Sequence, residues 1–217
     1  MKKFFVLGVL FILPLVAYLF FASGVHNFAK LPVLTKSIGS ISAFTSLDGK
    51  APVLLTDKIT ILGFLGEGMY QREGNAFNLN QKIYKKNFGF KDFQFVMILP
   101  YGSESQSKQL LSELDNITDV SGWHFLFGTE EQVSTFYKSL EAPYSLDSKL
   151  GTDYVFIIDK EKALRGRDVE TSENGIVKYG YDASSVAELS DEMNDDVKVI
   201  LAEYRLALKK YKADRKN

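Results

Sequence analysis

Four short runs of β-branched and aromatic residues recur along the chain and predict the strands of a buried sheet. They occupy residues 59–65, 93–99, 123–127 and 154–158. A short, mostly apolar run of this length, bounded by turn-forming residues, is typical of a buried strand. We therefore expect four core strands.

Apolar residues at helical spacing follow these runs and predict the helices that cover the sheet. The helical segments are residues 76–88, 103–115, 130–142 and a long segment from 184 onward. Asn75 is the expected N-cap of the first helix, and Thr129 with Gln132 has the spacing of a capping box. The order of strand, helix and strand predicts a βαβ unit with parallel strands, and hence an α/β fold with a mixed sheet flanked by helices.

Two hairpins are also expected. Residues 41–44 and 52–55 flank Asp48-Gly49, a dipeptide that favours a tight turn between antiparallel strands. After the fourth run, a solvated turn leads into residues 163–167, which predicts an antiparallel end to the sheet.

The N-terminus has the pattern of a membrane segment. Lys2 and Lys3 precede an apolar run over residues 4–22, close to the roughly 20 residues that cross a bilayer as a helix. The run is longer than the core of an export signal, so we favour an uncleaved signal anchor, while cleavage after export remains the alternative. The positive-inside rule then places the remainder on the extracytoplasmic side, the periplasm in a bacterium. The expected division is an anchor at 1–24, a tether at 25–37 and one domain at 38–217.

Composition excludes several kinds of chemistry. The chain has no cysteine, so it can form no disulfide, thiol nucleophile or cysteine metal site, and two histidines are too few for a histidine-rich site. The net charge of −1 gives no electrostatic footprint for nucleic acid. We expect no cofactor, although oxygen ligands for a hard cation remain possible.

The loop at residues 66–74 is the main candidate site, because it joins a predicted core strand to a helix N-terminus. Unpaired amides and the helix dipole point into such a loop. Its chemistry-bearing residues are Glu67, Met69, Tyr70, Arg72 and Glu73. A docking surface with large exposed groups and an ordinary polar loop are equally compatible with this pattern.

The remaining candidates have plainer explanations. His124 at the start of a strand indicates a packed or hydrogen-bonded side chain rather than a ligand. Arg165 and Arg167, near Asp168 and Glu170, indicate surface ion pairs rather than an anion site.

Two charged stretches of the terminal helix also have plain explanations. The acidic stretch Asp191, Glu192, Asp195 and Asp196 lacks the glycine of a calcium loop. The basic tail at 209–216 suits a helix C-terminus, with anionic lipid or an acidic partner as the alternative.

Several segments together resemble the membrane-anchored SCO/SenC family, which has a thioredoxin-like fold. The segments are residues 44–50, 59–65, 123–128 followed by 131–133, and 155–160. The resemblance implies a role in assembling the copper centre of cytochrome oxidase, or in thiol reduction outside the cytoplasm.

This chain departs from that family where the chemistry is. The positions of the family's Cys-x-x-x-Cys motif fall on Met69 and Glu73, and the segment 146–154, where the family has its distal histidine, contains none. Soft donors for Cu(I) and a thiolate for disulfide exchange are therefore missing.

Three functions remain open: a redox-inactive partner-binding protein, a structural subunit of a membrane complex, and an enzyme with a non-thiol mechanism. Ser103 and Ser105 have no histidine nearby in the sequence to activate them. We favour the first function, with a membrane protein or respiratory complex as the partner.

Overall fold

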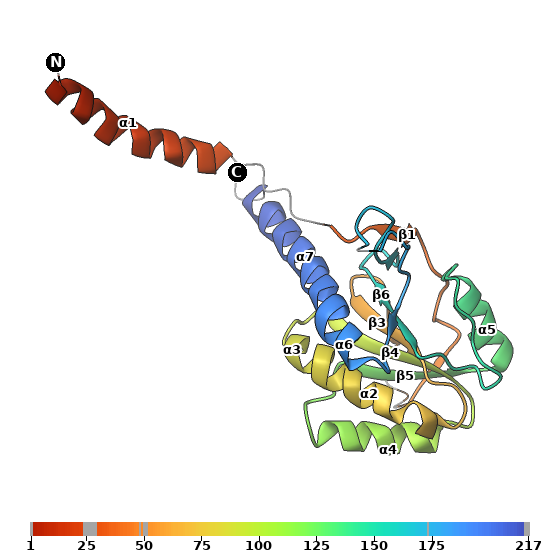
Figure 1. Cartoon of the computed structure of the whole chain (residues 1–217). Coiled ribbons are helices and arrows are strands. Elements are labelled where there is room, and N and C mark those ends of the chain that lie inside the picture. The colour runs from red at the N-terminus through yellow and green to blue at the C-terminus, as the bar shows by residue number, and fades with distance from the viewer. Residues whose placement is uncertain (1, 24–29, 48, 50–51, 173, 215–217) are drawn as a thin grey trace.

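A mixed sheet of eight strands forms the centre of the domain (Figure 1). The computed structural model describes residues 2–23, 30–47, 49, 52–172 and 174–214. The strands are β1 (Val33–Thr35), β2 (Thr45–Ser46), β3 (Ile59–Phe64), β4 (Phe93–Pro100), β5 (Trp123–Gly128), β6 (Tyr154–Ile158), β7 (Leu164–Arg165) and β8 (Tyr181–Asp182). Their order is β1-β7-β6-β3-β4-β5-β2, and β8 pairs with β6 outside this path.

The four predicted core strands are confirmed as β3, β4, β5 and β6. Strands β3, β4 and β5 run parallel, as the predicted βαβ unit requires, whereas β6 runs antiparallel to β3. Strand β7 pairs antiparallel with β6, so the predicted terminal hairpin is also present.

The helices occupy both faces of this sheet. They are α2 (Glu73–Leu79), α3 (Lys85–Asn87), α4 (Glu104–Asp115), α5 (Glu130–Lys138), α6 (Val186–Glu188) and α7 (Asn194–Asp214), with a 3₁₀ turn η1 (Met69–Gln71) and two π-helical turns, η2 (Asn80–Tyr84) and η3 (Leu189–Met193). Turn η2 joins α2 to α3, and η3 joins α6 to α7, so each pair continues as one helical segment.

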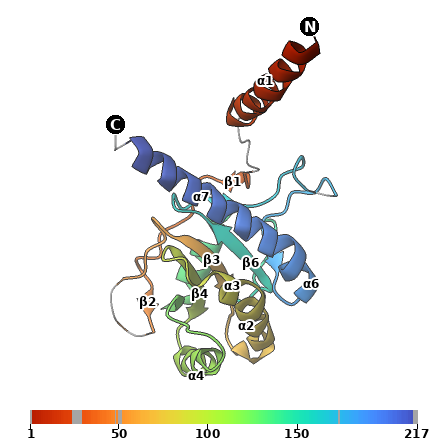
Figure 2. The same ribbon diagram turned by 90° about the vertical axis from the view of Figure 1, so that its left-hand side faces the viewer.

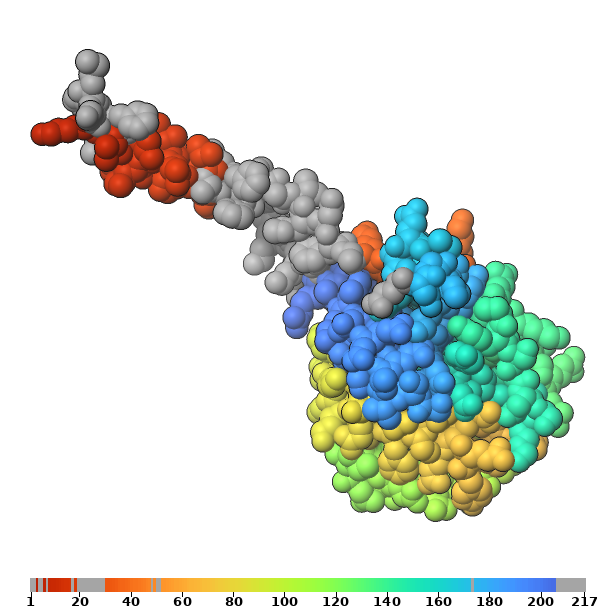
Figure 3. Space-filling view, viewed as in Figure 1, coloured from red at the N-terminus to blue at the C-terminus, as the bar shows by residue number. Residues whose placement is uncertain are grey.

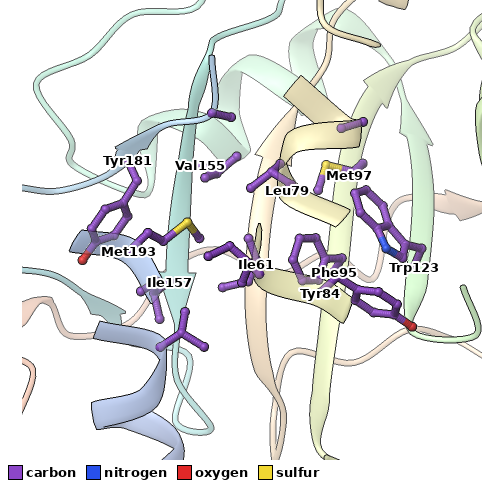
Figure 4. Close-up of a cluster of buried hydrophobic side chains, with 14 of the residues drawn as sticks. Ile61, Leu79, Tyr84, Phe95, Met97, Trp123, Val155, Ile157, Tyr181 and Met193 are labelled. Carbon is purple, nitrogen blue, oxygen red and sulfur yellow. The ribbon is translucent and has the colours of Figure 1, made fainter. Parts of the chain in front are cut away.

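Side chains alternate between two hydrophobic cores, one on each face of the sheet. On one face, Ile61 and Phe95 lie in one core with Leu79 of α2 and Met193 of η3 (Figure 4). The same core includes residues of α4 and α7. On the other face, Leu62, Phe64 and Val96 pack with α5 and with the segment before β3. Because both faces are covered, the strands read as continuous apolar runs in the sequence.

The capping prediction for α5 is confirmed. The Thr129 hydroxyl accepts a bond from the amide of Gln132, and the Gln132 side chain accepts one from the amide of Thr129. The predicted N-cap of the first helix is wrong. Helix α2 begins at Glu73, and Asn75 lies within it, because its side chain donates to Asp153 instead of capping the helix.

The predicted first hairpin is wrong. Residues 41–44 form a turn, and residues 52–55 belong to no strand. The strand formed here is β2, whose two residues lie just after 41–44 and pair with Phe127 and Leu126 of β5 at the edge of the sheet.

The predicted tether is too long. Strand β1 lies within residues 25–37 and pairs with β7, and Leu31 is buried in the core. The domain therefore includes the chain from Leu31 onward, and residues 25–29 of the predicted tether lie outside the described residues.

The N-terminal apolar run is helical, as α1 (Lys2–Ser23) with Pro14 inside it. Among the helices of the described residues, none is long and apolar enough to cross a membrane. The structure thus confirms the helix and not the transmembrane anchor.

The terminal helical segment lies across one face of the domain, as the turned view shows (Figure 2). In the space-filling view the blue surface of α6 and α7 lies against the yellow surface that contains α2 and α3 (Figure 3). Leu189, Met193, Val197 and Ile200 of this segment are fully buried in the core. This confirms the predicted amphipathic helix.

Candidate functional site

The loop at residues 66–74 follows β3 and is fastened to the segment 147–153. Gly66 and Gly68 have φ angles of 74° and 68°, which favour glycine. The amide of Glu67 donates to the Lys149 carbonyl at 2.7 Å, and Leu65 forms a β-bridge with Gly151. The backbone of the loop is therefore fixed by main-chain bonds.

Arg72 makes the strongest connection between the two segments. Its Nη2 lies 2.8 Å from Asp147 Oδ2 and its Nε lies 3.1 Å from Asp153 Oδ1. Asn75 Nδ2 also donates to Asp153 Oδ1, at 2.8 Å. A side chain at Gly151 would collide with the guanidinium, so glycine is required there. The charge of Arg72 is thus matched by two carboxylates.

Asp147 organises its own segment as well. Its Oδ1 accepts bonds from the amides of Lys149 and Gly151 at 2.8 and 3.0 Å. Burial raises the pKa of Asp147, but the Gly151 amide, the Arg72 guanidinium and the Lys149 amide outweigh burial and lower the pKa below its ordinary value of 3.8. The carboxylate is therefore ionised at neutral pH.

The five candidate residues of the loop do not form one exposed surface. Met69 is only 3% exposed, and Ser107 Oγ donates to its sulfur at 3.4 Å. The Arg72 side chain is only 11% exposed. The expectation that large groups of this loop are exposed holds for Tyr70, at 66%, and is wrong for Met69, because η1 turns its side chain into the core.

Glu67 and Glu73 stay accessible to solvent. Glu67 is exposed and Glu73 is half-buried. A hydrogen bond with Glu113 of α4, then partial desolvation, then the charge of Glu113 raise the pKa of Glu73 above its ordinary value of 4.5. The accessible part of the candidate site is therefore acidic and aromatic.

Sequence reasoning missed the role of Asp147 and Asp153. Both lie in the segment 146–154, and their sequence separation of 75 and 81 residues from Arg72 hides the pairing. The only signal was two carboxylates in a polar segment before a buried strand, and that pattern fits any solvated loop.

Arg165 and Arg167 form ion pairs, as predicted, but their partners are not the acidic residues that follow them in the sequence. Arg165 binds the buried Asp159 at 2.9 Å and Glu203 of α7 at 2.7 Å. Arg167 binds Asp196 of α7 at 2.7 Å. The predicted surface pairs with Asp168 and Glu170 are wrong because both guanidinium groups point toward α7.

The same pairs use part of the acidic stretch of the terminal helix. Asp196 binds Arg167, Glu192 binds Lys178 at 2.6 Å, and Asp195 binds Lys198 at 2.7 Å. In the described part of the chain, no group of three or more His, Cys, Asp and Glu residues is placed to hold a metal ion. His124 lies half-buried on β5, opposite Val96.

The residues at the loop do not fit a copper ion. The sulfur of Met69 is buried against Ser107, and the guanidinium of Arg72 sits between the carboxylates that could otherwise have approached a cation. A fixed positive charge disfavours a cation at that place. No step through copper or through a thiol follows from this arrangement.

Comparisons with solved structures support the predicted resemblance at the level of the fold. A SCO1/SenC family lipoprotein from Bacillus anthracis str. Ames superposes with a TM-score of 0.56 and 18% identity, over 80% of this chain and 99% of that one. Two proposed electron-transfer and electron-transport proteins from Aquifex aeolicus VF5 give TM-scores of 0.53 and 0.54 at 14% and 16% identity, over 76% of this chain and 92% and 98% of theirs. The fold is thus thioredoxin-like and shared with a SCO1/SenC protein.

No protein-family model matches the sequence, and the comparison with curated proteins gives no match either.

Proposed function

We propose that this chain is a redox-inactive, membrane-anchored thioredoxin-like protein that binds a partner outside the cytoplasm, in the assembly of a respiratory oxidase. The observation that carries the proposal is the pair of ion pairs from Arg72 to Asp147 and Asp153, called the Arg72 bridge below. It fixes the loop in one shape with two carboxylates and leaves Tyr70 exposed beside it. A large aromatic group held out on a fixed backbone loses little entropy when it is buried by a partner.

The absence of cysteine supports a binding role over a catalytic one. A thioredoxin-like fold without a thiol cannot exchange disulfides within its own chain. The fold shared with a SCO1/SenC protein makes the assembly of a respiratory oxidase the first process to test.

Tyr70 provides the direct test of partner binding. The tagged full-length protein is purified in mild detergent from its native cells, and the associated proteins are identified and quantified by mass spectrometry. We expect oxidase components with the wild type and their loss with Tyr70→Ala. Phe88→Ala is the matched control, because Phe88 is an exposed aromatic residue (48%) that follows α3, whereas Tyr70 lies before α2.

Retention of the same partners by Tyr70→Ala would contradict a binding role for this loop. The quantities also separate an assembly factor from a structural subunit. A substoichiometric association with incomplete oxidase is expected for the first, and a constant ratio to the finished complex for the second.

The apolar run at residues 4–22, with Lys2 and Lys3 before it, supports anchoring, and the solved neighbour from Bacillus anthracis is described as a lipoprotein. We expect the full-length protein to stay with membranes after alkaline carbonate extraction. We also expect its domain to be digested by protease added to spheroplasts. Release by carbonate would contradict the anchor. Protection from the protease would contradict its orientation.

A further inference from the structure

Lysine side chains surround an exposed aromatic ring in the turn between α3 and β4. Lys85, Lys86 and Lys91 are exposed, and Phe88 between them is 48% exposed. In the described part of the chain, none of the three lysines pairs with a carboxylate. Lys86 donates to the uncharged side chain of Asn194 at 3.2 Å. The charges of this turn are therefore available to a ligand outside the chain.

Two neighbouring elements add cations to the same surface. Lys58, before β3, donates to the carbonyl of Lys91 at 3.0 Å. Arg205 of α7 lies over the ring of Phe90, with its Cζ atom 5.4 Å from the ring centroid. This surface, the basic turn, comprises Lys58, residues 85–91 and Arg205. Between one and two turns after Arg205, the sequence of α7 adds further cations, Lys209, Lys210 and Lys212.

The acidic side chains near the basic turn do not cancel its charge. Asp92 pairs with Lys160 at 2.6 Å. The hydrogen bond from Lys160 lowers the pKa of Asp92 below its ordinary value of 3.8, against the effect of burial, and the charges of Lys160, Lys58 and Lys91 lower this pKa further. Among the described residues, the exposed carboxylates that flank the basic turn are fewer than its cations: Asp57, Asp119 and Glu161.

The basic turn lies close to the place where the chain enters the domain. Arg165 donates to the Leu31 carbonyl at 2.6 Å and binds Glu203 of α7 at 2.7 Å. Glu203 and Arg205 belong to one helix, and a helix with its side chains is about 10–12 Å across. The chain from Ser23, at the end of α1, to Leu31 can span at most about 28 Å. A bilayer crossed by residues 4–22 is therefore within reach of the basic turn.

The loop at residues 66–74 lies at the other end of the parallel strands. The basic turn precedes β4, whereas the loop follows β3, which runs parallel to β4 and is about 20 Å long. Figure 2 shows α7 along the upper side of the domain, with α2 and α4 below it. A contact at the basic turn thus leaves the loop free.

We propose that the basic turn rests on the surface of a bilayer that contains anionic phospholipid. Its lysine and arginine side chains bind lipid phosphate groups, and the ring of Phe88 enters the interface between headgroups and acyl chains. An acidic protein would match the charges equally well, but the short connection to residues 4–22 keeps this surface near lipid. The contact rests on the anchor of the proposed function and adds an orientation, because it turns Tyr70 away from the membrane.

The absence of cysteine allows one probe to be placed at either end of the domain. A side chain at Gly89, in the basic turn, or at Gly74, in α2, would meet no atom within 4 Å. Full-length Gly89→Cys and Gly74→Cys are labelled with a fluorophore and inserted into nanodiscs that contain a lipid with a nitroxide on its headgroup. We expect strong quenching at Gly89 when phosphatidylglycerol is present, and weaker quenching in phosphatidylcholine alone or at high salt. Gly74 should stay unquenched. Equal quenching in both lipids, or at both positions, would overturn the proposal.

Lysine variants test the cations themselves. In the variant that combines Lys85→Gln, Lys86→Gln and Lys91→Gln, the ratio of lipid-bound to free domains should fall at least about fivefold, which corresponds to roughly 1 kcal/mol from a single lysine. The matched control has the same change in net charge and replaces three exposed lysines elsewhere by glutamine: Lys108, Lys138 and Lys149. The control should keep the quenching at Gly89. An equal loss in both variants would mean that net charge, and not this surface, sets the contact.

These outcomes are separate from those for the proposed function. If Tyr70→Ala loses the partner while Gly89 stays unquenched, partner binding stands and the lipid contact is overturned. If Gly89 is quenched as expected but no partner depends on Tyr70, the lipid contact is confirmed and the proposed partner binding fails.

Failure of the anchor leaves the basic turn testable. If carbonate releases the protein, the same labelled chain is mixed with preformed vesicles of the two lipid compositions, and quenching at Gly89 is read again. If lipid never quenches Gly89 but the triple lysine variant loses a protein in the detergent purification, the surface belongs to an acidic protein and the lipid contact is overturned.

Discussion

Arg72 is much less exposed than either carboxylate that it binds. Its side chain is 11% exposed, against 37% for Asp147 and 50% for Asp153. The cost of removing charge from water therefore falls mainly on the guanidinium, which is weakly hydrated, while both carboxylates keep part of their hydration. The bridge can then stabilise the fold, whereas the deeply buried pair of Arg165 and Asp159 has a larger desolvation cost to offset.

We expect Arg72→Ala to lower the free energy of unfolding by about 1.5–3 kcal/mol, because Asp147 and Asp153 both lose a charged hydrogen-bond donor. Urea unfolding measures the loss. Hydrogen exchange should also show faster exchange at the amides of the 147–151 segment. Lys198→Ala, which removes a pair exposed to 61% and 65%, is the control and should change stability by less than about 0.5 kcal/mol. Equal effects of both variants would mean that the bridge contributes no more than a surface pair.

The pKa of Asp147 gives the bridge a pH dependence with a definite sign. The folded state keeps this carboxyl ionised to lower pH than the unfolded chain does, since its pKa is lowered below 3.8. Its stabilising contribution is therefore complete above the unfolded pKa of about 3.9 and is lost as the pH falls through the lower folded value. The stability difference between wild type and Asp147→Asn should be constant from neutral pH to about 5 and shrink below about 4. A difference that persists unchanged into strong acid would contradict this assignment.

At the scale of elements, helix ends differ in how well their caps are made. Thr129 forms a complete capping box with Gln132, whereas Ser103, at the N-cap of α4, makes no side-chain capping bond. Thr129→Ala should therefore lower the free energy of unfolding by about 1 kcal/mol. Ser103→Ala tests the same helix position without the bond and should cost less. Chemical denaturation of both variants decides between them, and a larger loss at Ser103 would show that the capping bond is not the cause.

The elements that could be predicted from the sequence are those whose signal is local. Strands β3 to β6 are long enough to read as apolar runs, and the capping box needs only Thr129 and Gln132. The short edge strands β1, β2 and β8 have two or three residues each, too few to show a period, and they form because a partner strand is available. The false hairpin around Asp48-Gly49 arose from the same limit: a turn signal does not say which strand the flanking residues will pair with.

The candidate site was less predictable than the fold. The position of the loop after β3 followed from the strand-helix order, but Met69 and Tyr70 are neighbours with opposite exposure, which depends on the 3₁₀ turn η1. The pairing of Arg72 with Asp147 joins two loops that only the folded sheet brings together. Charge sign alone could not choose Asp147 from the other acidic residues.

At the scale of the whole molecule, ion pairs attach the terminal helix to the edge of the sheet near β7 and β8. Arg165 contacts Glu203 of α7 and also donates to the carbonyl of Leu31 at 2.6 Å. Arg167 binds both carboxylate oxygens of Asp196, which also accepts a bond from Tyr181 at 2.5 Å. These contacts join the beginning and the end of the domain, so loosening the helix should affect the whole fold.

Adjacent residues allow this coupling to be measured. Asp196 is 6% exposed and binds Arg167 and Tyr181, whereas Asp195 lies at the surface and pairs with Lys198. Asp196→Ala leaves the buried Tyr181 hydroxyl without its acceptor and leaves Arg167 with only its longer contacts to Glu192, so it should lower the free energy of unfolding by about 3 kcal/mol. Asp195→Ala should change it by less than about 0.5 kcal/mol, because exposed pairs contribute little.

Hydrogen exchange should show which elements open. If α7 is coupled to the sheet, Asp196→Ala will accelerate exchange in β6 and β8 as well as in the helix. Exchange confined to α7 would mean that the helix can detach while the sheet stays intact.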